Sequence, residues 1–92
     1  MEIPNKIKIL GIDYDIKTLA PNSRDDRFMG RMDDALAIIS LRSDMPRNLA
    51  EQTLIHEVIH AISAGLGLKI SEPQTTALSA GIYAVLKENG WL

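Results

Sequence analysis

The stretch His56-Glu57-Val58-Ile59-His60 decides how this chain is organised, because it sets two histidines four residues apart with a glutamate directly after the first. On a helix, residues four apart lie one turn apart on the same face, so both imidazoles can reach one metal ion. Glu57 then projects toward the open side of that ion. This is the H-E-x-x-H arrangement, in which neutral histidine nitrogens bind Zn²⁺ and the glutamate takes a proton from the metal-bound water.

Two simpler interpretations of this stretch are chance and a pair of structural histidines in a core. The chain has only two histidines, and random placement gives this pattern in roughly one case in a thousand. On a helical wheel, one broad apolar stripe is formed by Leu54, Ile55, Val58, Ile59 and Ile62. The opposite side carries Thr53, His56, Glu57 and His60. Core histidines would fall inside the stripe, so the wheel favours a metal helix that lines a cleft.

Length and composition restrict the class of protein. The 92 residues, 46% hydrophobic and 24% charged, fit one domain over residues 1–92 with a modest core. A net charge of −2 without a Lys/Arg cluster argues against nucleic-acid binding, which needs a positive surface. The absence of cysteine excludes disulfides and thiolate ligands, so a metal must be held by His, Asp or Glu.

The N-terminal residues give no sign of export or of membrane insertion. Glu2, Lys6 and Lys8 interrupt residues 1–10, which therefore contain no apolar run of signal-peptide length. No other stretch approaches the length of a membrane span. We therefore expect a cytoplasmic protein without a membrane partner.

Alternating polar and apolar residues in the N-terminal half predict a small sheet. Residues 6–10 and 14–17 read as a hairpin with its reversal at 11–13, and residues 20–27 as a polar loop. Residues 28–32 and 35–41 read as a second hairpin that turns at Asp33-Asp34. We expect three to four strands, rich in antiparallel pairing. The strand at 35–41 is the expected edge along which an extended peptide could bind.

Two helices are expected in the C-terminal half. The metal helix begins near Pro46 or at a capping box formed by Asn48 and Glu51, and runs to about Ala64, where Gly65 with Gly67 ends it. The last helix opens with a capping box of Ser71 and Gln74 and stops at Asn89-Gly90. The predicted fold class is α+β, a small sheet packed against both helices.

The third metal ligand is not determined by the motif. A catalytic zinc ion takes three protein ligands and leaves the fourth position to water, so a carboxylate or a water must complete the site. Glu72 lies beyond the glycine turn, and two antiparallel helices could bring it back to the histidines. Against this, an acidic residue suits a helix's first turn for its dipole alone, and Pro73 restricts the backbone of Glu72. Glu51, on the aliphatic side of the metal helix, is a weaker candidate.

A resemblance to a known class follows from these residues. His56-Glu57-x-x-His60 with a helix-borne Glu72 resembles the gluzincin metallopeptidases. The order of elements from about Lys6 to Gly90, with the last helix reading Leu78-Ser79-Ala80-Gly81-Ile82-Tyr83, resembles small phage-type members allied to the ImmA/IrrE family. The resemblance implies zinc bound by His56, His60 and Glu72, Glu57 as general base and acid, and a minimal zincin fold.

The resulting hypothesis is zinc-dependent hydrolysis of peptide bonds in a protein or peptide, with Glu57 activating the water. Tyr83 or Tyr14 could stabilise the oxyanion if the fold brings one of them near. One alternative is a non-catalytic domain stabilised by zinc, in which Asp13 or Asp44 closes the coordination. Another is a phage-type protein-binding module that retains the metal site.

Overall fold

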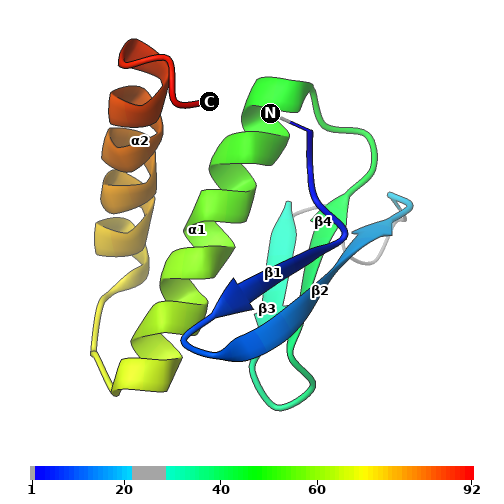
Figure 1. The fold of residues 1–92 in the computed structure, drawn as a ribbon, viewed down its shortest axis with the longest axis vertical. Helices are drawn as coiled ribbons and strands as arrows, with labels where there is room; N and C mark the ends of the chain where they lie inside the picture. The colour runs from blue at the N-terminus through cyan, green and yellow to red at the C-terminus, as the bar shows by residue number, and fades with distance from the viewer. Residues whose placement is uncertain (1, 22–28) are drawn as a thin grey trace.

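A computed structural model describes residues 2–21 and 29–92 of the chain. Its elements are β1 (Lys6–Ile9), β2 (Ile12–Leu19), β3 (Gly30–Asp33), β4 (Ile38–Arg42), α1 (Arg47–Leu66) and α2 (Glu72–Glu88). They form three layers, with α1 between the sheet and α2 (Figure 1). The α+β class is confirmed. No helix of the described residues is long and apolar enough to cross a membrane.

The sheet is mixed, which differs from the expected antiparallel-rich sheet. Its strand order is β1-β2-β4-β3, and β2 runs parallel to β4 between the two antiparallel hairpins. The strand expected at residues 35–41 is therefore internal, and its prediction as the edge was wrong. Ile39 and Leu41 are 0% and 2% exposed, as a strand paired on both sides requires. Among the described strands, β3 is the edge on this side of the sheet.

The first hairpin turns more tightly than predicted. Ile9 pairs with Ile12, so the loop has two residues, Leu10 and Gly11, with φ of 51° and 82°. Two positive φ values match the type I′ turn, whose twist suits a two-residue hairpin. The Leu10 side chain reaches α1, where its Cδ1 lies 2.7 Å from the position that a Cβ on Gly65 would take. Gly65 thus makes room for this contact and does not end the helix.

The second hairpin and the loop before it also differ from prediction. Asp33 pairs with Ile38, so residues 34–37 form the turn, and residues 35–37 belong to it rather than to the strand. The Asp33 carboxylate accepts a hydrogen bond from the Leu36 N–H at 3.0 Å, which is a local turn bond. Most of the loop predicted at 20–27, and Phe28 of the strand predicted at 28–32, lie outside the described residues.

The helix ends were predicted with mixed success. α1 follows Pro46 without a side-chain cap, so the capping box of Asn48 and Glu51 is wrong. α1 ends at Gly67, which has φ of 68° and donates its N–H to the Ser63 carbonyl. The capping box at the start of α2 and its end at Asn89 are confirmed.

The hydrophobic core lies between the sheet and α1. Its buried residues are Ile9, Tyr14, Ile16, Ile39 and Leu41 from the sheet, with Leu54 and Ala61 from α1. The described residues of α2 contribute none, and the α2 backbone approaches α1 but no strand. The expected packing of the sheet against both helices therefore holds for α1 alone.

Gly67→Ala should lower the free energy of unfolding by about 1 kcal/mol or more, because an L side chain at positive φ clashes with its own backbone. Gly67→Asn is the matched control and should lose less, since asparagine tolerates the left-handed region better. Urea unfolding of the three proteins measures the difference. Equal stability of wild type and Gly67→Ala would contradict this account of the helix end.

Candidate metal centre

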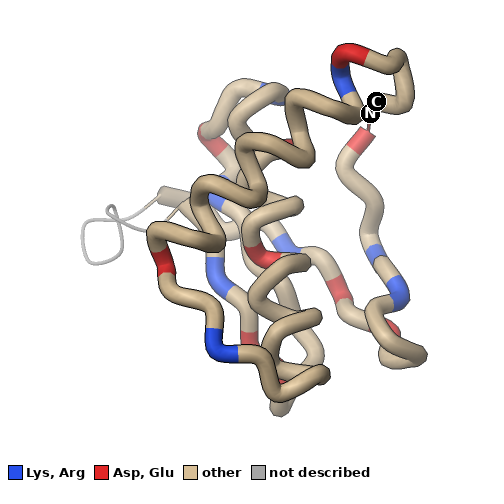
Figure 2. The backbone as a smooth tube through the Cα atoms, turned by 90° about the vertical axis from the view of Figure 1, so that its left-hand side faces the viewer, with Lys and Arg blue, Asp and Glu red and all other residues tan. Residues whose placement is uncertain are grey.

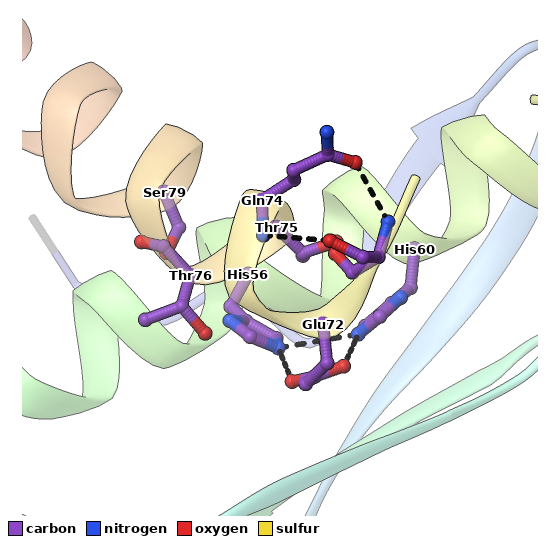
Figure 3. A network of polar contacts seen from close by, with 8 residues as sticks. His56, His60, Glu72, Gln74, Thr75, Thr76 and Ser79 are labelled. Carbon is purple, nitrogen blue, oxygen red and sulfur yellow. Dashed lines mark hydrogen bonds and ion pairs between the residues drawn. The ribbon is translucent and has the colours of Figure 1, made fainter. Parts of the chain in front are cut away.

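Two histidines of α1 and the first residue of α2 converge on one point. His56 Nε2 lies 2.7 Å from Glu72 Oε1, His60 Nε2 lies 3.0 Å from Glu72 Oε2, and the two ring nitrogens are 3.1 Å apart. Figure 3 shows both rings directed at each other, with the Glu72 carboxylate spanning them. The turn at Gly67 and the cap at Ser71 set where α2 begins, and they thereby bring Glu72 back over the histidines.

When both histidines are in the same protonation state, this triangle of contacts brings like groups together. A histidine Nε2 donates to the carboxylate only when that nitrogen carries a proton. If both nitrogens donate to Glu72, they face each other as two donors at 3.1 Å. If both are neutral acceptors, three lone pairs point at one another. A cation bound by both neutral rings and the carboxylate would separate these groups, because it accepts electron density from all three atoms.

The ligand types and spacing fit a zinc ion. The three side chains each offer one ligand atom, and these atoms lie within 4.8 Å of one another. Zinc bonds of about 2.0–2.1 Å in a tetrahedron separate ligand atoms by roughly 3.3 Å, close to the 2.7–3.1 Å found here. Two imidazoles with one carboxylate form a ligand set used by catalytic zinc. The predicted residues His56, His60 and Glu72 are therefore brought together.

No fourth protein ligand joins the three in the described part of the chain. Asp44 forms an ion pair of 2.7 Å with Arg42. Asp13 lies 3.7 Å from Lys8. Glu72 keeps 65% of its side chain exposed, whereas His56 keeps 17%, so solvent reaches the centre from the carboxylate side. A metal ion held by these three residues would therefore have room for a ligand from solvent.

A cleft of about 340 Å³ is lined by two of the three candidate ligands, His56 and Glu72. Its walls come from all three layers: Met29 and Gly30 of the sheet side, Leu49, Gln52, Thr53, His56 and Glu57 of α1, and Glu72, Thr76 and Ser79 of α2. Thr76 and Ser79 continue along α2 from the ligand set (Figure 3). The cleft therefore runs between β3 and α2, with α1 as its floor.

Glu57 lies in this cleft against the backbone of β3. Glu57 is buried, with 7% of the residue exposed. A Cβ added to Gly30 would lie 3.2 Å from Glu57 Oε2 and 2.8 Å from Thr53 Cγ2. The strand β3 can therefore lie this close to α1 only because residue 30 has no side chain. Sequence analysis missed Gly30. A glycine that opens a strand without any turn to explain it was the available signal.

The environment of Glu57 favours its protonated form. Burial, opposed by the charge of His60 and reinforced by that of Glu72, raises the pKa of the Glu57 carboxyl to about 7. The carboxylate has no hydrogen-bond partner among the described residues. A cation bound by His56 and Glu72 would lower this pKa, because positive charge favours the ionised form. A pKa in this range suits a general base at neutral pH.

Other residues weighed from the sequence lie away from the centre. Tyr14 is 3% exposed in the core. The Tyr83 hydroxyl donates to Glu51 Oε1 at 3.0 Å, and Lys87 Nζ lies 3.5 Å from the same oxygen. Glu51 is 0% exposed, so it joins α1 to α2 and is not a metal ligand. Neither tyrosine is placed to stabilise an oxyanion.

Comparison with protein-family models, curated proteins and solved structures finds no match to this chain. The resemblance to gluzincins and to the ImmA/IrrE family is therefore carried by the motif residues alone. It remains a prediction.

His60→Ala and Glu72→Ala should each weaken zinc binding by about 100-fold or more, since even indirect partners of metal ligands contribute factors of 10–100. Elemental analysis after gel filtration measures the bound zinc. Asp44→Asn is the control and should retain one ion per chain, because Asp44 pairs with Arg42 instead. Unchanged stoichiometry in Glu72→Ala would move the third ligand elsewhere.

In the metal-free protein, Glu57 should make stability fall as pH rises from about 4.5 to about 7. Its pKa is raised from 4.5 to about 7 on folding, so in this window the native state holds a proton that the unfolded chain has released. The accumulated loss is on the order of 3 kcal/mol.

Urea unfolding in the presence of a chelator, repeated across this pH window, measures the effect. Glu57→Gln cannot titrate at this position, so its stability should change less with pH than that of wild type. The remaining titrating groups are common to both proteins. Parallel profiles would contradict the raised pKa.

Proposed function

We propose that this domain is a zinc-dependent peptide hydrolase that acts on a protein or peptide. One observation carries the proposal: a separate buried carboxylate, that of Glu57, lines one open cleft with His56 and Glu72, two of the three residues that could hold a metal ion. A site that only stabilises the fold needs the ligands. It does not need a carboxyl with a pKa near 7 beside an open coordination position.

In this proposal the bound ion and the side chains have separate chemical roles. When bound, zinc supplies Lewis acidity, which acidifies a water and polarises a carbonyl. His56, His60 and Glu72 hold the ion in place. Glu57 accepts a proton on its carboxylate and returns it to the leaving amine, the two proton transfers that peptide hydrolysis requires.

The substrate in this proposal is an extended peptide that lies along β3. Within the described chain β3 pairs with β4 alone, and the first residue of β3, Gly30, forms the wall of the cleft beside Glu57. An extended peptide can add to such an edge by backbone hydrogen bonds. Thr76 lines the cleft on the α2 side. The edge strand is thus β3, one strand further out than the sequence indicated.

The two alternatives are less well supported. A closed structural zinc site needs a fourth ligand, and the described residues supply three. A purely protein-binding module does not account for Glu57 beside the ligands. The expected setting remains that of a phage-type, cytoplasmic relative of the ImmA/IrrE metallopeptidases.

Glu57→Gln should lower hydrolysis of an unfolded, dye-labelled protein by about 100-fold or more, because general acid–base groups contribute factors of about 10²–10⁴. Bound zinc should stay at the wild-type level, since Glu57 is not among the three ligands. Glu2→Gln, an exposed change distant in sequence, is the control and should leave both unchanged. Retained activity with retained zinc would remove Glu57 from the chemistry.

A further inference from the structure

The metal cleft extends to one side of the candidate ligands. His56 lines it, whereas His60 does not. Away from the ligands, its lining follows one row of side chains on each helix: His56, Gln52 and Leu49 of α1, and Glu72, Thr76 and Ser79 of α2. Seven residues of a helix span about 10 Å. Because α1 and α2 run in opposite directions (Figure 1), both rows lead from the ligands toward the N-terminal end of α1.

This extension of the cleft carries no charge of its own. The charged residues that line the cleft are Glu57 and Glu72, which lie beside the His56 ring or directly after it in sequence. Residues 73–86 include no charged side chain, which leaves α2 uncharged between its two ends (Figure 2). Among the described residues of the lining, none is a lysine or an arginine. A carboxylate from a ligand would therefore find no cation in this lining.

Apolar side chains line the extension on two sides. Leu49, seven residues before His56, is half-buried on α1. Met29, directly before β3, lines it from the sheet side and is 49% exposed. The buried hydroxyl of Ser79 already donates to the Thr76 carbonyl at 2.9 Å. An incoming group thus meets two apolar side chains and a hydroxyl that needs no further partner, which suits an apolar group.

We propose that this extension is a specificity subsite, which takes an apolar side chain such as leucine or methionine from a substrate residue beside the cleaved bond. The inference rests on the proposed peptide hydrolysis. An extended peptide that pairs with β3 turns every second side chain toward the face of the sheet that α1 covers. One side chain near the ligands therefore enters the cleft, and Leu49 and Met29 determine which side chain is accepted.

Charged side chains fit this subsite poorly. An acidic side chain would lie beside the carboxylates of Glu57 and Glu72, without a cation in the described lining to pair with. A lysine or arginine would be attracted to these carboxylates, but one is a candidate metal ligand and the other is the proposed base. Carried past them, its charged end would lie unpaired against Leu49. The subsite should therefore select against charge of either sign, and against acidic residues most.

Digestion of a synthetic peptide library of random sequence by the zinc-loaded full chain tests the proposal. Mass spectrometry of the products reads the residues on each side of every cleaved bond. For wild type, leucine or methionine should be enriched at one position beside the bond, and aspartate and glutamate depleted there by about tenfold or more. Leu49→Arg adds a cation to the subsite and should raise cleavage at acidic residues, relative to leucine, by about tenfold or more.

Two further variants keep the test specific. Leu78→Arg makes the same change on the exposed side of α2, outside the lining of the cleft, and should leave the wild-type profile unchanged. Leu49→Phe narrows the subsite without adding charge, so it serves if Leu49→Arg does not fold. It should shift the preference from leucine toward alanine by about tenfold. Zinc content equal to that of wild type shows that each variant keeps the metal centre.

The outcomes separate the subsite from the hydrolysis on which it rests. Cleavage by wild type without preference for apolar over acidic residues would overturn the subsite and leave the hydrolase standing. A preference that neither Leu49 variant changes would do the same, as would a profile that Leu78→Arg shifts as strongly as Leu49→Arg. Absence of cleavage of any peptide by zinc-loaded wild type would instead overturn the proposed hydrolysis, and the subsite with it.

Discussion

The structure depends on three electron-pair donors meeting at one point between two helices. His56 and His60 approach each other to 3.1 Å, and Glu72 closes the triangle from α2. Atoms of this kind repel when nothing lies between them, and a divalent cation turns that repulsion into attraction. The start of α2 at Ser71 and the reversal at Gly67 put the Glu72 carboxylate over the histidines.

The two histidines lie on the side of α1 that faces α2, and this affects which residues the two helices can bury between them. One side of α1 packs on the sheet with Leu54 and Ala61, and the other must accept α2 beside two polar rings. The α1–α2 contact is accordingly polar, with Thr75 and Ser79 buried and Tyr83 donating to Glu51. The apolar residues of α2 are left on its outer face. Exposed Leu78 and Ile82 thus accompany the polar contact of α2 with α1.

The sequence was most informative where a local rule applies. The i, i+4 spacing of His56 and His60 and the capping box at Ser71 depend on residues within one turn, and both are found as predicted. Pairing between distant strands has no such local signal. The parallel contact of β2 with β4, and hence β3 as the edge, follows from the packing of the whole sheet. The contact of Glu51 with Tyr83 also had no local signal, since its partner lies on another helix.

Because His56 and Glu57 are adjacent in sequence, their side chains point toward different layers of this fold. Successive helical residues diverge by about 100°, so the histidine faces α2 while the glutamate faces β3. Thr53 and Glu57 form one row beneath Gly30, and His56 and His60 form the next row beneath Glu72. Gly30 of the sheet thus lies over Glu57, and Glu72 of α2 lies over the two histidines. The cleft between β3 and α2 is lined by His56, Glu57 and Glu72 together, so its shape depends on both layers being packed on α1.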